Sequence, residues 1–449
     1  MFRRILSLLA VFGIGAFLLF VAKFPSVKVG DVATPHVVTV QPKQPTLVCP
    51  GPVFVNGGQS GVTLGSFTQS GSAQVAGVDS GKPLSQTAYA DLVLAGKATG
   101  SKSFNAIQTQ FANGKQAFGL SSANCVPGAN SAWLVAGDNS IGREALLVLV
   151  NSTDVDATVS LQLYGPSGSI QGAGLSGISA PAGKVTVLPL SSFAPKAETF
   201  AVQVSSRGAE LGIWLQQKTV RGLTPSGLEM VGVSAEPSKQ VSIPGIFLRN
   251  TTALGKLAES DANFADVKPI LRVTAPGDKD VHFTAQLQGA DGSSFGTVLQ
   301  GSVQAGSTKD FALLDVADGN YAMQLEADGA LLASVRYSRL SGKTPDFAWA
   351  QSVAPSELNA GFTTARNGKS KLSVMNSNAV KASFTMNGRT LQIAANSNLV
   401  IDLAAGQHYV IKSSAPLAAS QVIDVNGGVT VSTVLDYQSV GGKIRVSVR

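Results

Sequence analysis

The sequence predicts an all-β protein in which an N-terminal transmembrane helix precedes tandem immunoglobulin-like β-sandwich domains. One pattern of strands recurs three times, at a spacing of roughly one hundred residues. Charged residues make up only 14% of the chain and glycine contributes 48 of its 449 residues, a composition typical of exported β-domains with many tight turns. Beyond the N-terminal apolar run, no segment predicts a long helix.

The N-terminus predicts a membrane anchor. Arg3 and Arg4 precede an uncharged apolar run over residues 5–22, and Lys23 closes it. About eighteen residues are just enough to cross a hydrocarbon core of ~30 Å, and the paired arginines favour a cytoplasmic N-terminus. We therefore assign residues 1–23 to a cytoplasmic stub and a single-pass anchor, with the bulk of the chain extracytoplasmic. The alternative is secretion after signal cleavage, although residues 20–26 contain no clean small-x-small site.

A short stalk and a cysteine-bracketed region follow the anchor. Residues 24–45 contain four prolines and predict an extended stalk. Residues 46–128 predict a β subdomain whose ends are marked by Cys49 and Cys125. Outside the cytoplasm such a lone pair is expected to form a disulfide, and the alternative is two buried free thiols.

Three sandwich copies are predicted at residues 129–240, 241–352 and 353–449. Each contains a strand with strict alternation, which places one face on a core and the other in water. A β-propeller is the alternative fold, but its blades usually span ~40–50 residues, about half of one copy. The connectors between copies are moderately apolar, so we expect a stiff rod or arc. The residues expected to point inward on the alternating strands are Val159, Leu161 and Leu163, then Phe283, Ala285 and Leu287, then Phe384 and Met386.

Residues 132–165 carry a resemblance to a known family. The strand Leu147-Val-Leu-Val-Asn151, the alternating strand at 157–165 and the Cys-Pro-Gly-Pro start at Cys49 resemble an actinobacterial family of exported, membrane-anchored proteins of unknown function. The resemblance implies a setting in the cell envelope and no catalytic residues. The third copy lacks an arginine matching Arg143.

Motifs for catalysis or metal binding are absent from the sequence. Three histidines cannot supply the usual metal sites or Ser-His-Asp triads, and no nucleophile elbow or phosphate-binding loop occurs. Three minor hypotheses remain: cation binding by acid pairs in turns, a glycosidase pair in an acidic loop, and an exposed tryptophan as a sugar platform. The residues concerned are Asp154 with Asp156, Asp278 with Asp280, Glu259, Asp261 and Asp266, and Trp133, Trp214 and Trp349.

These observations predict a non-enzymatic scaffold or interaction protein of the cell envelope, with no metal and no cofactor. The expected partners are the membrane, through the N-terminal helix, and envelope glycopolymers or envelope proteins. The alternative is a carbohydrate-binding or carbohydrate-active envelope protein. Nucleic acid is not expected as a partner, because the net charge of +7 is dispersed and not gathered into a basic stripe.

Overall fold

The computed structural model describes residues 36–40, 46–56, 67–79, 82–83, 87–89, 92–97, 105–290, 294–425, 427–435 and 442–446. The anchor predicted at residues 1–23 lies outside these ranges, as does most of the predicted stalk. Within them, no helix is both long and apolar enough to span a membrane. The described chain is all-β, as predicted. Its helices are short: η1 (Leu190–Ser192), α2 (Thr251–Ser260) and η2 (Ala262–Val267).

The chain divides into two compact units. The smaller unit contains residues 1–43 and 439–449, where β1 (His36–Val40) pairs antiparallel with β34 (Gly442–Val446). The final residues, predicted to belong to the third copy, are therefore in this smaller unit. The larger unit contains residues 44–438 and holds all the features described below.

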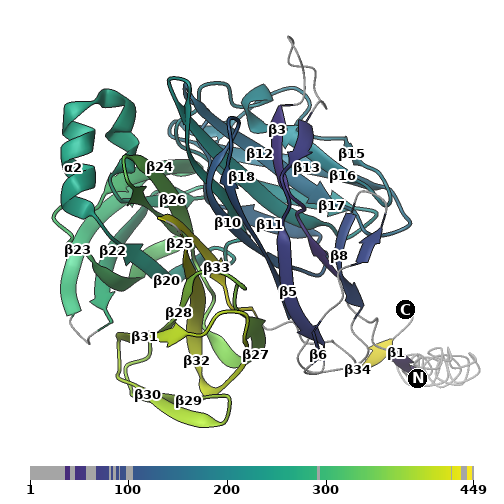
Figure 1. Ribbon diagram of the computed structural model, residues 1–449. Coiled ribbons are helices and arrows are strands. Elements are labelled where there is room, and N and C mark those ends of the chain that lie inside the picture. Colours follow the sequence, from purple (N-terminus) through teal and green to yellow (C-terminus); the bar gives the residue numbers. More distant parts are fainter. Residues whose placement is uncertain are drawn as a thin grey trace, which may run out of the picture. The chain divides into compact units, whose positions relative to one another are not determined.

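Four antiparallel sheets of the larger unit each contribute one inner strand to a common axis (Figure 1). From the axis outward, the first sheet is β10 (Phe118–Cys125), β9 (Asn105–Asn113), β5 (Gln74–Asp79) and β6 (Lys82–Pro83). The second is β19 (Thr224–Val231), β18 (Gly212–Arg221), β12 (Arg143–Val150) and β16 (Val185–Pro189). The third is β26 (Thr344–Gln351), β25 (Gly319–Ser341), β21 (Ile270–Ala275) and β24 (Ser307–Ala312). The fourth is β33 (Gly428–Thr433), β32 (His408–Val425), β28 (Lys369–Asn376) and β31 (Ser397–Leu403).

The four inner strands form a closed ring. Strand β10 packs on β19, β19 on β26, β26 on β33, and β33 packs back on β10. The cysteine-bracketed region thereby contacts the third copy, and the side chain of Asn124 donates a hydrogen bond to the carbonyl of Thr433. The prediction of a stiff rod or arc is wrong, because side-by-side packing around one axis buries the inner strands of all four sheets.

The last three of these sheets are each covered by a second sheet, which completes a sandwich. In the first copy the covering sheet is separate; in the other two, the long strands β25 and β32 pair in both sheets. The first covering sheet contains β11 (Ser131–Leu134), β17 (Ala201–Arg207), β13 (Ala157–Gly165), β14 (Gly168–Ile170) and β15 (Ile178–Ala180). The others add β20 (Ser238–Leu248), β22 (Val281–Gly289) and β23 (Ser294–Val303), and then β27 (Ser356–Thr363), β29 (Ala382–Met386) and β30 (Arg389–Ile393).

The alternating strands pack as predicted. On β13 the side chains of Val159, Leu161 and Leu163 are buried while the residues between them are exposed. They meet Leu147 of β12 and Leu215 of β18 in one apolar cluster, which is the core between the two sheets of the first sandwich. The predicted inward residues of β22 are likewise buried, and on β29 Phe384 is buried and Met386 partly buried.

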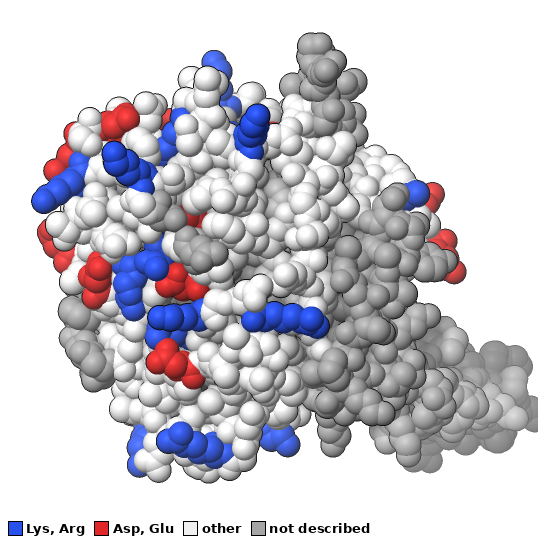
Figure 2. Space-filling model, in the orientation of Figure 1, with Lys and Arg blue, Asp and Glu red and all other residues white. Residues whose placement is uncertain are grey.

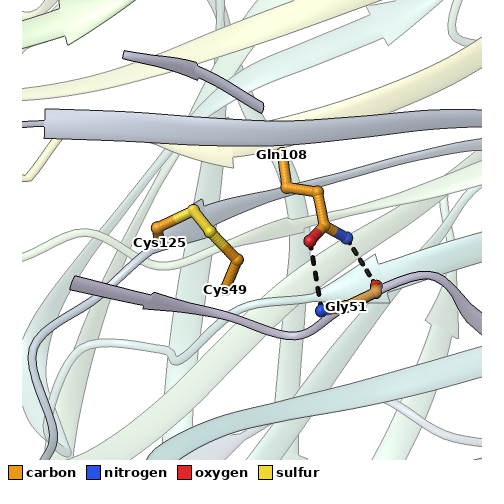
Figure 3. The surroundings of a disulfide bond; sticks show 4 residues. All are labelled: Cys49, Gly51, Gln108 and Cys125. Atoms are coloured by element: carbon orange, nitrogen blue, oxygen red, sulfur yellow. Dashed lines mark hydrogen bonds between the residues drawn. A yellow bond between two sulfur atoms is a disulfide. The ribbon is translucent and has the colours of Figure 1, made fainter. Parts of the chain in front are cut away.

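The predicted disulfide is present: Cys49 and Cys125 are bonded (Figure 3). Next to it, the amide of Gln108 accepts a hydrogen bond from the Gly51 nitrogen at 3.1 Å and donates one to the Gly51 oxygen at 2.6 Å. These bonds fix the entering chain, β2 (Thr46–Cys49), to β9 and β10. The remaining strands of this region form two small sheets, in which β2 pairs with β8 (Leu92–Lys97) and β7 (Thr87–Tyr89) pairs with β8, while β3 (Val53–Asn56) pairs with β4 (Phe67–Ser70).

The ring has two different ends. Each inner strand is the second strand of a hairpin. The four hairpins turn at residues 114–117, 222–223 and 342–343 and between Val425 and Gly428, and these turns lie at one end, which we call the turn end. The opposite end holds the disulfide at the close of β10 and the bond from Asn124 to Thr433. The chain therefore enters and leaves the larger unit at the end opposite the turns.

Candidate functional site

A single carboxylate joins the four inner strands near the turn end. Asp346 lies on β26, and its Oδ2 accepts hydrogen bonds from the amide of Leu120 on β10 at 2.8 Å and of Val429 on β33 at 3.1 Å. Its Oδ1 accepts from the amide of Leu228 on β19 at 3.0 Å. Because inner strands of neighbouring sheets share no ladder hydrogen bonds, this side chain satisfies amides that would otherwise be buried without partners.

Glycines make room for this carboxylate. One glycine precedes each of the three donor residues: Gly119, Gly227 and Gly428. A Cβ at Gly119 would lie 2.4 Å from Asp346 Oδ1, and one at Gly428 would lie 3.0 Å from Asp346 Oδ2. At Gly227 a Cβ would meet the ring of Phe347 at 2.5 Å, and the backbone there has a φ of +112°. A side chain at these positions would occupy the axis, so glycine is required by close approach.

A second layer of hydrogen bonds crosses the ring below Asp346. The hydroxyl of Thr430 on β33 donates to Glu229 Oε1 on β19 at 2.7 Å, and it accepts from the amide of Ser122 on β10 at 3.0 Å. Both Glu229 and Thr430 are buried. Polar hydrogen bonds thus cross the axis at two levels, whereas the sandwich cores around it are apolar.

Burial determines the charge state of the two axial acids. It raises the pKa of the Asp346 carboxyl to about 7, although the amides of Leu120, Leu228 and Val429 lower it. Burial also raises the pKa of Glu229 well above its usual range, against the opposing bond from Thr430. Removing a carboxylate from water disfavours its charged form, so the enclosed axis favours the protonated form of both acids.

A cleft of about 800 Å³ opens beside the axis at the turn end, between the sheet of β10 and the sheet of β33. Its apolar surface includes Phe111, Leu120 and Ile423. The backbone amide of Leu120 also donates to Asp346, so the axial hydrogen bonds fix a residue of the cleft wall. Its polar side chains come from the two neighbouring sheets, from loops beside them and from β25: Ser72, Gln74, Thr109, Gln110, Asn367, Lys369, Arg339 and Asp424.

One ion pair crosses this cleft. Arg339 Nε on β25 lies 2.9 Å from Asp424 Oδ1 on β32, and about a fifth of each side chain is exposed. Asp424 is the only carboxylate among the described lining residues, so the cleft does not contain two facing acids. Elsewhere on the face shown in Figure 2, basic and acidic side chains are interspersed, and its described part carries no stripe of one sign.

The predicted acidic loop forms a structural cluster instead of a catalytic pair. Asp266 on η2 binds three arginines, Arg143 on β12 at 3.1 Å, Arg221 on β18 at 2.6 Å and Arg336 on β25 at 3.2 Å. Burial alone would raise its pKa, but the three guanidinium groups outweigh burial and hold the pKa well below its usual range. This cluster joins η2 to the first and second sandwiches.

The other two acids of that loop each have a different partner. Asp261 caps η2 by accepting a hydrogen bond from the amide of Asn263, and Glu259 lies 4.0 Å from Lys268. These contacts give each acid a structural partner and lend no support to a glycosidase pair in this loop.

The acid pairs in turns have a backbone role. Asp156 accepts a hydrogen bond from the amide of Ala182, and Asp280 accepts one from Ala305 in the same way. Within the described residues, no group of three or more His, Cys, Asp or Glu side chains could hold a metal ion.

The tryptophans are buried, so none of them forms an exposed sugar platform. Trp214 and Trp349 are among the largest fully buried side chains, and Trp133 is 4% exposed. The Nε1 of Trp349 donates to Gln217 and the Nε1 of Trp133 donates to Glu236.

The two histidines of the larger unit differ in environment. His282 is exposed and pairs with Asp328 at 2.9 Å. His408 is partly buried beside Thr363, and burial lowers the pKa of its imidazole.

Sequence reasoning missed the axial residues Asp346 and Glu229. Their one signal is an acid within an apolar strand, as in Pro345-Asp-Phe-Ala-Trp349. A carboxylate is rarely buried without partners, and these partners lie on other strands.

The family model that matches this chain covers residues 78–412 and describes a family of unknown function (DUF5719); the chain belongs to this family. No curated protein matches the sequence significantly.

Similarity to solved structures is weak. Thermotoga maritima 1070 is 8% identical, with 26% of this chain and 93% of that chain covered and a TM-score of 0.22. The BSP domain of a biofilm-associated protein is 10% identical, with 75% and 64% covered and a TM-score of 0.11. Such scores do not assign a fold or an activity.

Proposed function

We propose that this protein is a membrane-anchored, extracytoplasmic scaffold or interaction protein of the actinobacterial cell envelope, built from immunoglobulin-like sandwiches and without enzymatic activity. The observation that carries this proposal is that the two ends of the ring differ. The chain enters and leaves the larger unit at one end, and four hairpin turns lie at the other. An anchored ring of this kind holds its turn end free for a partner.

Two further observations support an extracytoplasmic interaction role. The Cys49–Cys125 disulfide suits an oxidising compartment. At the turn end, Leu223 is 98% exposed, and Lys115 and Lys343 are also exposed. Loops on a rigid scaffold are the usual place for recognition, and a large apolar side chain fully in water suits a contact surface.

The described acids favour binding over hydrolysis. Asp346 and Glu229 are enclosed within the ring, and Asp424 in the cleft is paired with Arg339. A glycosidase needs two carboxyl groups that face one substrate across ~5–10 Å, and the cleft offers one.

Site-specific photocrosslinking in living cells tests the role of the turn end. A photoreactive residue at Leu223 should yield crosslinks to envelope components. The matched control is Val155, which is also apolar and 51% exposed but lies in the turn after β12, at the opposite end. Equal yields and partners from both positions, or none from Leu223, would contradict a role for the turn end.

Orientation in the membrane has a separate test. Alkaline phosphatase fused after Pro45 should be active, because that enzyme folds only in an oxidising compartment. An inactive but stable fusion would reverse the proposed topology.

A further inference from the structure

The cleft at the turn end has the size and the lining of a ligand site. Its volume of about 800 Å³ lies within the range of small-molecule sites, ~300–1,000 Å³. It opens at the seam where the cysteine-bracketed region meets the third copy, and β25 contributes Arg339. The seam exists only because the ring closes, so the cleft is a property of the whole unit.

Its walls combine an apolar surface with hydroxyl and amide groups. Phe111 is partly exposed and packs edge-on against Phe118, with ring centroids 5.9 Å apart. Around it lie the hydroxyl of Thr109 and the exposed amides of Gln74 and Asn367. Aromatic and aliphatic groups cover the C–H face of a sugar ring, while planar amides and hydroxyls exchange hydrogen bonds with its alcohols.

The two amides are available to a ligand. Gln74 Oε1 and Asn367 Nδ2 are 3.5 Å apart, which is a long contact across the mouth of the cleft. A ligand with several hydroxyl groups could replace this weak contact with shorter bonds to both side chains.

The charge of the cleft is positive. Arg339 and Asp424 neutralise each other at 2.9 Å, which leaves Lys369 as the surplus charge. In the described part of the chain, Lys369 forms no ion pair. Lys369 lines the cleft and is directly opposite Asp424 in the ladder of β28 and β32.

From this arrangement we infer that the cleft binds a negatively charged oligosaccharide. Phe111 packs against the sugar rings, Gln74 and Asn367 bind their hydroxyl groups, and Lys369 pairs with an acidic substituent. This inference names a ligand class for the proposed interaction role and rests on that role.

Binding to the purified full-length protein in detergent, measured by calorimetry with two matched probes, tests the inference. The probes are the hexamer of galacturonic acid and the uncharged hexamer of glucose. The acidic hexamer should bind saturably and at least about 10-fold more tightly than the neutral one, because one well-placed ion pair contributes roughly that factor. Failure of the acidic hexamer to bind, or equal affinity for both, would overturn the inference.

Three variants separate sugar recognition from general charge attraction. Lys369→Gln should weaken binding of the acidic hexamer about 10-fold and leave the neutral hexamer within twofold. The paired change Gln74→Ala with Asn367→Ala should weaken both. Lys343→Gln is the control, because it removes the same charge from an exposed turn at the same end but outside the cleft. An equal loss in Lys343→Gln and Lys369→Gln would show nonspecific attraction and overturn the site.

Failure of this inference can be distinguished from failure of the proposed function. All the positions changed are exposed, so the urea unfolding midpoint of each variant should match the parent and verify that it is folded. The binding assay uses purified protein and is independent of localisation, whereas crosslinking at Leu223 is independent of the cleft. Crosslinks without sugar binding would reject the ligand class alone.

Discussion

The carboxylate of Asp346 accepts a hydrogen bond of 2.8 Å from the amide of Leu120, a residue 226 positions earlier in the chain. The same Oδ2 accepts from Val429, close to the last described residues of the larger unit. One side chain of the second copy thus joins the cysteine-bracketed region to the third copy. This contact is the point at which the ring closes, and it lies directly beneath the candidate cleft.

Replacing Asp346 with alanine should destabilise the larger unit strongly. The change leaves the amides of Leu120, Leu228 and Val429 buried without acceptors, and each such group costs about 1–3 kcal/mol. We expect a loss of roughly 3 kcal/mol or more in the free energy of unfolding, measured by urea denaturation. Asp402→Ala is the control, because that side chain is 85% exposed and should change stability by less than about 0.5 kcal/mol. An equal loss of stability in both variants would show that Asp346 does not hold the inner strands together.

A methyl group at Gly119 should disrupt the same point sterically. In Gly119→Ala the new Cβ would lie 2.4 Å from Asp346 Oδ1 and 2.6 Å from the Leu228 nitrogen, and the backbone φ is +140°. The midpoint temperature of thermal unfolding should fall by several degrees at least, because the backbone must move to relieve the contact. Gly114→Ala, in the adjacent turn with open space around it, should melt close to the parent. A stable Gly119→Ala protein would mean that the axis is more loosely packed than described.

Stability should decrease as pH rises through the range in which Asp346 ionises. Its pKa is about 7 in the folded protein and about 3.9 in an unfolded chain, so the folded state binds the proton more tightly. The contribution is fully present below pH 4 and is lost by about pH 7, with a total of roughly 4 kcal/mol. Urea midpoints at pH 5 and pH 8 should differ more in the parent than in Asp346→Asn. An unchanged difference would show that other groups control the pH response.

The Asp266 cluster should respond to pH in the opposite direction. Arg143, Arg221 and Arg336 hold its pKa well below the usual range, so its stabilisation is present above about pH 4 and is lost as pH falls below that. Asp266→Ala leaves three partly buried arginines facing one another and should cost about 3 kcal/mol, read from urea unfolding at pH 7. Glu259→Ala, whose side chain is 73% exposed, should be nearly neutral. Similar losses in both variants would refute the cluster's role.

The repeat could be predicted because its determinants are local. Asn151 directly follows β12 and Asn376 ends β28. Both donate to a carbonyl four residues later and accept from an amide two residues later. The pattern of a strand ending in asparagine therefore identifies the same turn in two copies. Alternation in β13 and β22 is also local, and the structure confirms the buried faces it predicts.

The features related to function were harder to predict from the sequence than the strands were. A lone pair of cysteines, together with the expectation of export, was enough to predict their disulfide. The cleft could not be predicted, since Gln74 on β5, Arg339 on β25 and Asn367 in the loop before β28 are far apart in the sequence and belong to no motif. The rod was the wrong expectation because the apolar connectors were interpreted as contacts between successive copies only.

The sequence by itself determined the strands, their buried faces, the turns and the disulfide, since each depends on residue spacing within a few positions or on a lone pair of cysteines. The tertiary structure alone decided that four sheets share one axis, that Asp346 and Glu229 lie inside it, and that a cleft opens beside it. The physical reason is that these features depend on partners more than one hundred residues apart. The role of Asp346, and of the glycines that precede its leucine donors, can be recognised only when the ring brings these strands within hydrogen-bonding distance.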